Sequence, residues 1–88
     1  MKRPASPSRT RVRNNIRSLR FQHGEMTQQD LADRVGLTRQ TIIAIEQGRY
    51  SPSLEAAFKI ARVFAVPLEE VFQYDDAPER RDPHAPAT

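Results

Sequence analysis

The stretch TQQDLADRVGLTRQTIIAIEQG, residues 27–48, sets the architecture of this 88-residue chain. Thr27 followed three residues later by Asp30 has the spacing of a helix capping box, and apolar residues recur at helical intervals after it. Gly36 can adopt a positive φ without a steric penalty, and Thr38 can cap another helix immediately afterwards. The stretch therefore predicts two short helices joined by a tight turn, at about residues 28–35 and 39–47.

A further helix is predicted on the N-terminal side of this pair. Ile16, Leu19, Arg20 and His23 fall on one helical face, and Gly24 supplies a stop.

Two more helices are predicted on the C-terminal side. Ser53 can cap a fourth helix, and Pro67 suits the start of a short fifth one. No stretch of four or more residues alternates strictly in polarity within a β-branched context, so no strand is predicted. The expected fold class is all-α, a compact bundle of five helices. The apolar stripe of the fourth helix is predicted to be Leu54, Ala57, Phe58, Ala61 and Phe64, and the fifth helix carries Leu68, Val71 and Phe72.

The length of the chain corresponds to one domain. Apolar residues concentrate in the middle of the chain, whereas both ends are rich in proline, charge and small polar residues and cannot bury enough surface to order themselves. We therefore expect a folded domain over residues 13–74, a flexible basic arm over 1–12 and a disordered, proline-rich tail over 75–88.

Composition excludes several kinds of site. The chain has no cysteine, so it can form neither a disulfide framework nor a thiolate zinc site, and we expect no metal and no cofactor. No apolar run approaches the roughly 20 residues needed to cross a bilayer, and the N-terminus lacks the apolar stretch of a secretory signal. The expected location is the cytoplasm.

Catalysis is also disfavoured. His23 lies at a predicted helix end and His84 in the predicted tail, so neither has a partner for acid-base chemistry. The acidic pairs at 69–70 and 75–76 are adjacent in sequence, and adjacent side chains do not converge. We therefore expect that the protein is not an enzyme.

Charge is distributed unevenly along the chain. Residues 1–24 hold seven basic side chains and no acid, whereas residues 65–88 hold six acids against Arg80 and Arg81. The basic end favours a polyanion as partner, although a solvated, disordered extension explains charge of this kind equally well.

The predicted helix at 39–47 has two distinct faces. At about 100° per residue, Ile42, Ile45 and Glu46 fall on the inward half, and the opposite arc remains uncommitted. Arginine and glutamine can make bidentate hydrogen bonds to guanine and adenine edges, and small apolar side chains can contact thymine methyl groups. The composition of this outward face is therefore typical of a surface that contacts the base edges of DNA. Its members are Arg39, Gln40, Ile43, Ala44 and Gln47.

The segment TQQDLADRVGLTRQTIIAIEQGRYSPSLEAAFKIARVFAVPLEEVF closely resembles the XRE family, the Cro and cI type of helix-turn-helix regulators, and the likeness covers about residues 14–74. The resemblance implies a lambda-repressor-like fold and a sequence-specific, double-stranded DNA-binding regulator of transcription, with repression as the expected role. It also implies a bacterial or phage-type protein associated with the nucleoid. The family usually has one residue between the glycine after the first helix and the next cap. This chain has two, Glu25 and Met26, so we expect a bulged loop.

The resemblance also implies which residues contact DNA. Gln28 is expected to hold a phosphate and to brace the start of the third helix. The resemblance implies base contacts by Arg39, Gln40, Thr41 and Ala44, and phosphate contacts by Gln28, Arg49 and Tyr50. Ile43 of the outward face is a further expected base contact, and Thr38 a further expected phosphate contact. An arginine of the first helix commonly pairs with the glutamate that ends the third, which here implies a structural ion pair between Arg20 and Glu46.

Assembly and partners follow from the small size of the domain. One such domain contacts few base pairs, so a homodimer on paired half-sites is expected. Val71, Phe72 and Tyr74 offer apolar surface that either forms the dimer interface or completes the core. Arg9, Arg11 and Arg13 of the arm are candidate DNA contacts. The alternative function is an antitoxin-like protein that uses the same fold to bind an unknown protein partner.

Overall fold

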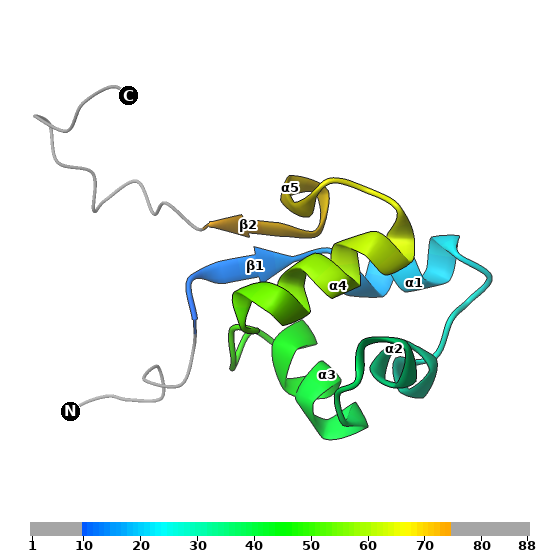
Figure 1. Cartoon of the computed structure of the whole chain (residues 1–88). Helices are drawn as coiled ribbons and strands as arrows, with labels where there is room; N and C mark the ends of the chain where they lie inside the picture. Colours follow the sequence, from blue (N-terminus) through cyan, green and yellow to red (C-terminus); the bar gives the residue numbers. More distant parts are fainter. Residues whose placement is uncertain (1–9, 75–88) are drawn as a thin grey trace, which may run out of the picture.

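The computed structural model describes residues 10–74, and this part of the chain forms five helices and two short strands. In chain order they are β1 (Val12–Asn14), α1 (Ile16–Gln22), α2 (Gln28–Val35), α3 (Arg39–Glu46), α4 (Leu54–Phe64), α5 (Leu68–Val71) and β2 (Phe72–Tyr74). The helices pack together, and the two strands lie side by side at one edge of the bundle (Figure 1). The first and last described residues therefore lie near each other.

Local sequence signals fix the helix starts, as predicted. The Thr27 hydroxyl accepts from the Asp30 backbone N–H while the Asp30 carboxylate accepts from the Thr27 N–H, which completes the capping box of α2. The Thr38 hydroxyl caps α3 by accepting from the Thr41 N–H, and the Ser53 hydroxyl caps α4 by accepting from the Ala56 N–H. Gly36 ends α2 with a φ of +75°, the left-handed conformation that the tight turn requires.

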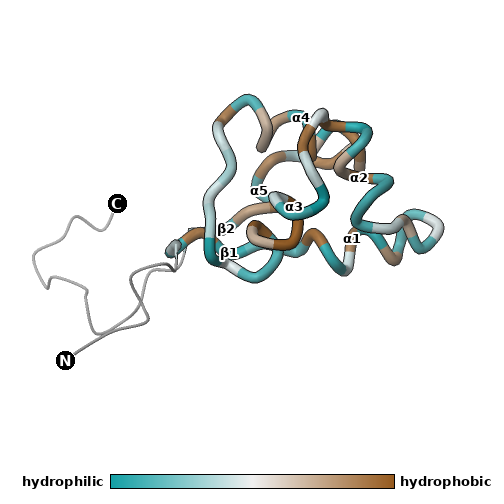
Figure 2. The backbone as a smooth tube through the Cα atoms, turned by 90° about the horizontal axis from the view of Figure 1, so that it is seen from below, coloured by the Kyte–Doolittle hydropathy of each residue, from teal (hydrophilic) through white to brown (hydrophobic). Residues whose placement is uncertain are grey.

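Each helix contributes at least one fully buried side chain to a single core. Hydrophobic and hydrophilic positions are mixed within the helices, as expected where only one face of a helix is buried (Figure 2). The largest fully buried side chains are Ile16, Leu31, Ile42, Ile45, Ile60, Phe64 and Val71.

The two strands correct the prediction that the chain contains none. They pair antiparallel, with Val12 opposite Tyr74 and Asn14 opposite Phe72. Each strand has only three residues, too few for an alternating pattern to be recognised. The pairing joins the two ends of the domain, which no local sequence pattern reveals.

The end of the predicted flexible arm is also part of the fold. The Thr10 N–H donates to the Gly48 carbonyl at 3.0 Å, and the hydroxyls of Thr10 and Ser51 lie 2.6 Å apart. The fold thus includes Thr10 to Val12, because backbone pairing supplies the order that apolar burial does not. Residues 1–9 of the arm and the predicted tail, 75–88, lie outside the described residues.

The buried stripe of α4 differs from the predicted one. Leu54 is 67% exposed and Phe58 49% exposed, whereas Ala57, Ala61 and Phe64 are buried as predicted. At about 100° per residue, Phe58 points about 120° away from Phe64, beyond the arc that the core covers. Two large apolar side chains of α4 are thus left at the surface.

The loop between α1 and α2 is bulged, as its extra residue predicts. Glu25 has a φ of +56°, in the left-handed region that side chains rarely adopt. Next to it, Met26 is buried and its N–H donates to the Arg20 carbonyl at 2.9 Å. The bulge therefore places the Met26 side chain in the core and the Met26 backbone against α1.

Two truncations test the strand pairing. A chain that starts at Thr10 retains all the hydrogen bonds described above, so its melting temperature should match that of the full chain. A chain that starts at Arg13 lacks Val12 of β1 and the hydrogen bonds of Thr10. It should melt at least about 4 °C lower, the shift expected for a destabilisation of about 1 kcal/mol in a domain of this size. Equal melting temperatures for the two truncations would show that β1 does not stabilise the domain.

Candidate nucleic-acid interface

Helices α2 and α3 form a closely packed pair joined by the turn from Gly36 to Thr38. Ala32 of α2 is fully buried, and its small side chain lets α3 approach. Ile42 and Ile45 are 0% and 1% exposed, so they anchor the inner face of α3 in the core. The pair is held by apolar burial on one side, which leaves the other side of α3 available to a partner.

The outer face of α3 carries the predicted base contacts. Arg39 and Gln40, at the first two positions of the helix, are exposed, while Thr41, Ile43 and Ala44 are partly buried. The Thr38 hydroxyl accepts from the Thr41 N–H at 3.1 Å and lies 2.9 Å from the Thr41 hydroxyl. Thr38 and Thr41 thus stabilise the start of the helix that presents Arg39 and Gln40.

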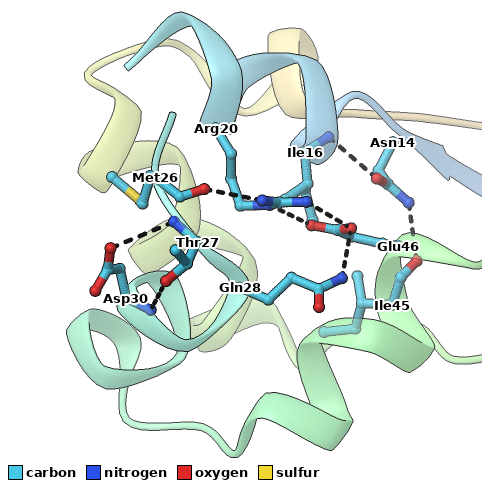
Figure 3. Close-up of polar contacts among 9 residues, drawn as sticks. All are labelled: Asn14, Ile16, Arg20, Met26, Thr27, Gln28, Asp30, Ile45 and Glu46. Atoms are coloured by element: carbon cyan, nitrogen blue, oxygen red, sulfur yellow. Dashed lines mark hydrogen bonds and ion pairs between the residues drawn. The ribbon is translucent and has the colours of Figure 1, made fainter. Parts of the chain in front are cut away.

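The structure brings Arg20 and Glu46 together. The Arg20 Nε donates to Glu46 Oε2 at 2.7 Å, and Nη2 donates to Oε1 at 3.2 Å (Figure 3). The remaining guanidinium nitrogen, Nη1, donates to the Met26 carbonyl at 2.8 Å. The two side chains are only 8% and 9% exposed, so this bidentate pair connects α1, the following loop and α3 in a nearly water-free position.

Gln28 joins the same network. Its Nε2 donates to Glu46 Oε1 at 3.1 Å, so Gln28, the first residue of α2, contacts the last residue of α3 (Figure 3). The family resemblance implied a brace to the start of α3 instead. The start of α3 is already capped by Thr38, whereas Glu46 has lone pairs left after binding Arg20. The second N–H of the Gln28 amide remains able to donate to a partner.

A cleft of about 650 Å³ lies where these elements meet. Side chains from α1, the loop before α2, the start of α2 and both ends of α3 line it. They include the predicted contacts Gln28 and Arg39, and also two residues of α1, Arg17 and Phe21. Neither Arg17 nor Phe21 was predicted as a functional residue. The one sequence signal that could have linked them is their spacing of four residues, which places them on the same face of α1.

The other predicted contacts lie away from this cleft. Arg49 and Tyr50 are exposed in the loop after α3. The Arg11 guanidinium lies 5.8 Å from the centroid of the Tyr74 ring, and Arg13 is exposed on β1. Arg9 is outside the described residues. Contacts of these side chains with DNA remain predictions.

Two other kinds of site find no support in the described part of the chain. Among residues 10–74, no group of three or more histidine and acidic side chains gathers as metal ligands do. No helix in that range is long and apolar enough to span a membrane.

Comparison with known proteins identifies the family. A model of the helix-turn-helix family matches residues 16–71, which extend from the start of α1 to the end of α5. The chain belongs to the XRE family of helix-turn-helix regulators. The family consists of DNA-binding regulators of transcription, which agrees with the resemblance drawn from residues 27–72.

Relatives of this helix-turn-helix regulator occur in archaea and bacteria. It is 51% identical, over 65 residues, to an uncharacterized HTH-type transcriptional regulator of Methanocaldococcus jannaschii, a match that covers 74% of this chain and 97% of the relative. It is 34% identical over 58 residues to the transcriptional repressor RstR of the cryptic phage CTXphi in Vibrio cholerae, which covers 66% of this chain and 51% of the repressor.

A solved structure shares the fold. The crystal structure of a candidate DNA-binding protein from Bacteroides fragilis superposes with a TM-score of 0.62 and covers 70% of this chain and 98% of its own. The two sequences are only 22% identical, so this match supports the arrangement of helices and nothing finer.

Replacement of Glu46 by alanine tests the structural role of the ion pair. The variant leaves the Arg20 guanidinium buried without its carboxylate, so it should lose about 3–5 kcal/mol of unfolding free energy, measured by thermal or urea denaturation. The matched control is Glu55→Ala, because Glu55 pairs with Lys59 at 3.7 Å at the surface and should contribute less than about 1 kcal/mol. If Glu46→Ala has the same melting temperature as the parent protein, the ion pair does not stabilise the fold.

Proposed function

We propose that this protein is a sequence-specific repressor that reads the major groove of double-stranded DNA with α3. The observation that carries the proposal is the division of α3 between two faces. Its inner residues are fully buried, while Arg39 and Gln40 project from its first turn with no ion pair or side-chain hydrogen bond among residues 10–74. Guanidinium and amide groups in this position suit the edges of guanine and adenine.

Contacts with the DNA backbone would hold α3 in the groove. Gln28 lies at the first position of α2, where free backbone N–H groups and the helix dipole favour a phosphate. Arg49 and Tyr50 are exposed just after α3 and can reach the strand on its other side. Repression is the role proposed because the Vibrio cholerae relative is a repressor, and a protein of this size blocks transcription simply by occupying its site.

Substitutions on the outer face of α3 should change DNA sequence preference, whereas substitutions on its inner face should lower stability. Arg39→Ala and Gln40→Ala should alter the sequences recovered by selection from random duplex DNA, while stability stays within about 0.5 kcal/mol because both side chains are exposed. Ile42→Ala should instead cost about 2–5 kcal/mol of stability, since it leaves a cavity in the core. If all three variants select the same DNA sequences as the parent protein, α3 is not the helix that reads the bases.

We further propose that the protein acts as a homodimer on two half-sites about one helical turn apart. The interface suggested by the sequence needs correction, because Val71 is 0% exposed and cannot contact a second copy. Phe72 is partly buried and Tyr74 is 66% exposed. These two remain available at the edge of the bundle.

An apolar groove of about 300 Å³ beside β2 suits a second copy of the chain. Ser51 and Pro52, which line it, belong to the loop that follows α3. A two-fold axis through the groove would bring the loops that follow α3 in the two copies toward each other, an arrangement compatible with two α3 helices on adjacent half-sites. Its apolar lining is formed by Val12, Pro52, Leu54, Ala57, Leu68 and Phe72.

The two exposed apolar residues of α4 provide a matched pair for testing this interface. Leu54→Asp places a charge in the groove and should shift the protein toward monomer in sedimentation equilibrium. Phe58→Asp changes an exposed residue of the same helix that does not line the groove, so the dimer should persist. A parent protein that sediments as a monomer both free and on DNA would rule out the dimer.

A further inference from the structure

Two cationic side chains open onto the cleft between α1, α2 and α3. Arg17 comes from α1 and Arg39 from the first position of α3, and neither forms an ion pair among residues 10–74. Glu46 is also in the lining, but its charge is balanced by Arg20. Glu25 is exposed and without an ion pair in the same range, so the cleft retains a net positive charge and favours an anion.

The position of Arg17 depends on an exposed aromatic ring. Phe21 is 54% exposed and so contributes little to the core. Its ring centroid lies 5.5 Å from the Arg17 guanidinium and 5.6 Å from that of Arg20. Arg20 is held by Glu46 and Met26, so its contact with the Phe21 ring favours one position of that ring, on which Arg17 can rest.

We propose that Arg17, supported by Phe21, binds a phosphate of the DNA backbone at this cleft. The inference rests on the proposed function, since it requires that α3 enters the major groove. With α3 in the groove, the strand that passes the start of α2 runs along the cleft, and α1 forms its far wall. Arg17 is thus a backbone contact next to the one proposed for Gln28.

The chemistry of the site suits a phosphate better than a base edge. A guanidinium makes charge-assisted, bidentate hydrogen bonds to phosphate oxygens. Arginine loses considerable side-chain freedom on binding, and a guanidinium already held against a ring loses less. Phe21 is therefore a positioning residue that acts through Arg17 without touching DNA.

The test compares two arginine variants on the duplex that the parent protein selects. Arg17→Ala should lower the slope of log K against log salt concentration by about 0.9 for each phosphate that the variant no longer neutralises. Arg62→Ala removes the same charge from the exposed side of α4, outside the cleft, and should leave the slope unchanged. Ethylation of backbone phosphates should also cease to interfere with binding at one position per half-site in Arg17→Ala alone.

A double-mutant cycle tests the role of Phe21. Phe21→Leu keeps an apolar side chain but removes the ring, so it should weaken binding in the parent protein and have no further effect in the Arg17→Ala background. Circular dichroism of each variant verifies that the fold is retained, as expected for two exposed residues.

The outcomes separate this proposal from the one on which it rests. Absence of duplex binding by the parent protein overturns the proposed function. Binding by the parent with an equal slope and equal ethylation interference in Arg17→Ala overturns the phosphate contact. Additive effects of the two substitutions overturn the positioning role of Phe21.

Discussion

The buried pair of Arg20 and Glu46 is the interaction on which the arrangement of this domain depends. Apolar surfaces tolerate small sliding movements, but a bidentate guanidinium-carboxylate contact permits one geometry. Here that contact links α1 to α3, and its remaining hydrogen bonds extend to the Met26 carbonyl and the Gln28 amide. Burial of charge is costly unless every group is satisfied, and these partners satisfy it. The relative positions of the first three helices are therefore specified by polar geometry inside an apolar bundle.

The same network connects the interior to the surface proposed for DNA. Glu46 ends the helix whose first residues face outward, and Gln28 begins the helix whose start is suited to a phosphate. One carboxylate is thus close to both, so the proposed reading face of α3 and the proposed phosphate contact at Gln28 keep a constant position relative to each other. Preorganisation of this kind lowers the entropy lost on binding, because the protein does not have to arrange these elements when DNA arrives.

Two large apolar side chains outside the core lie at the two surfaces proposed for partners. Phe21 borders the positive cleft of α1, α2 and α3, whereas Leu54 borders the apolar groove beside β2. The two surfaces share no lining residue and differ in character, one suited to an anion and the other to an apolar face of a second copy. The proposed DNA contact and the proposed dimer contact therefore do not compete for the same surface.

The features read correctly from the sequence are those encoded within a few neighbouring residues. Thr27, Asp30, Gly36 and Thr38 act through contacts at most a few positions along the chain, so the caps, the turn and the bounds of α2 follow from local spacing alone. The Arg20 and Glu46 contact joins distant residues and was accessible only through the family resemblance. Local spacing also showed which face of α3 is buried, because a helix that carries isoleucines on one side has one way to bury them.

The remaining features depend on which distant segments meet. Strand pairing of Val12 with Tyr74 joins the two ends of the domain, and neither three-residue strand carries a signal of its own. Val71 is buried, whereas Leu54 and Phe58 are exposed. This difference depends on how much of each helix the neighbouring elements cover, and the hydrophobicity of a residue does not specify that. The cleft that brings Arg17 and Phe21 beside Gln28 likewise exists only once three helices are packed. The helices can be predicted from the sequence because short-range hydrogen bonds define their ends. The exposed surfaces and the strand pairing cannot, because they arise from packing between residues that are far apart in the sequence.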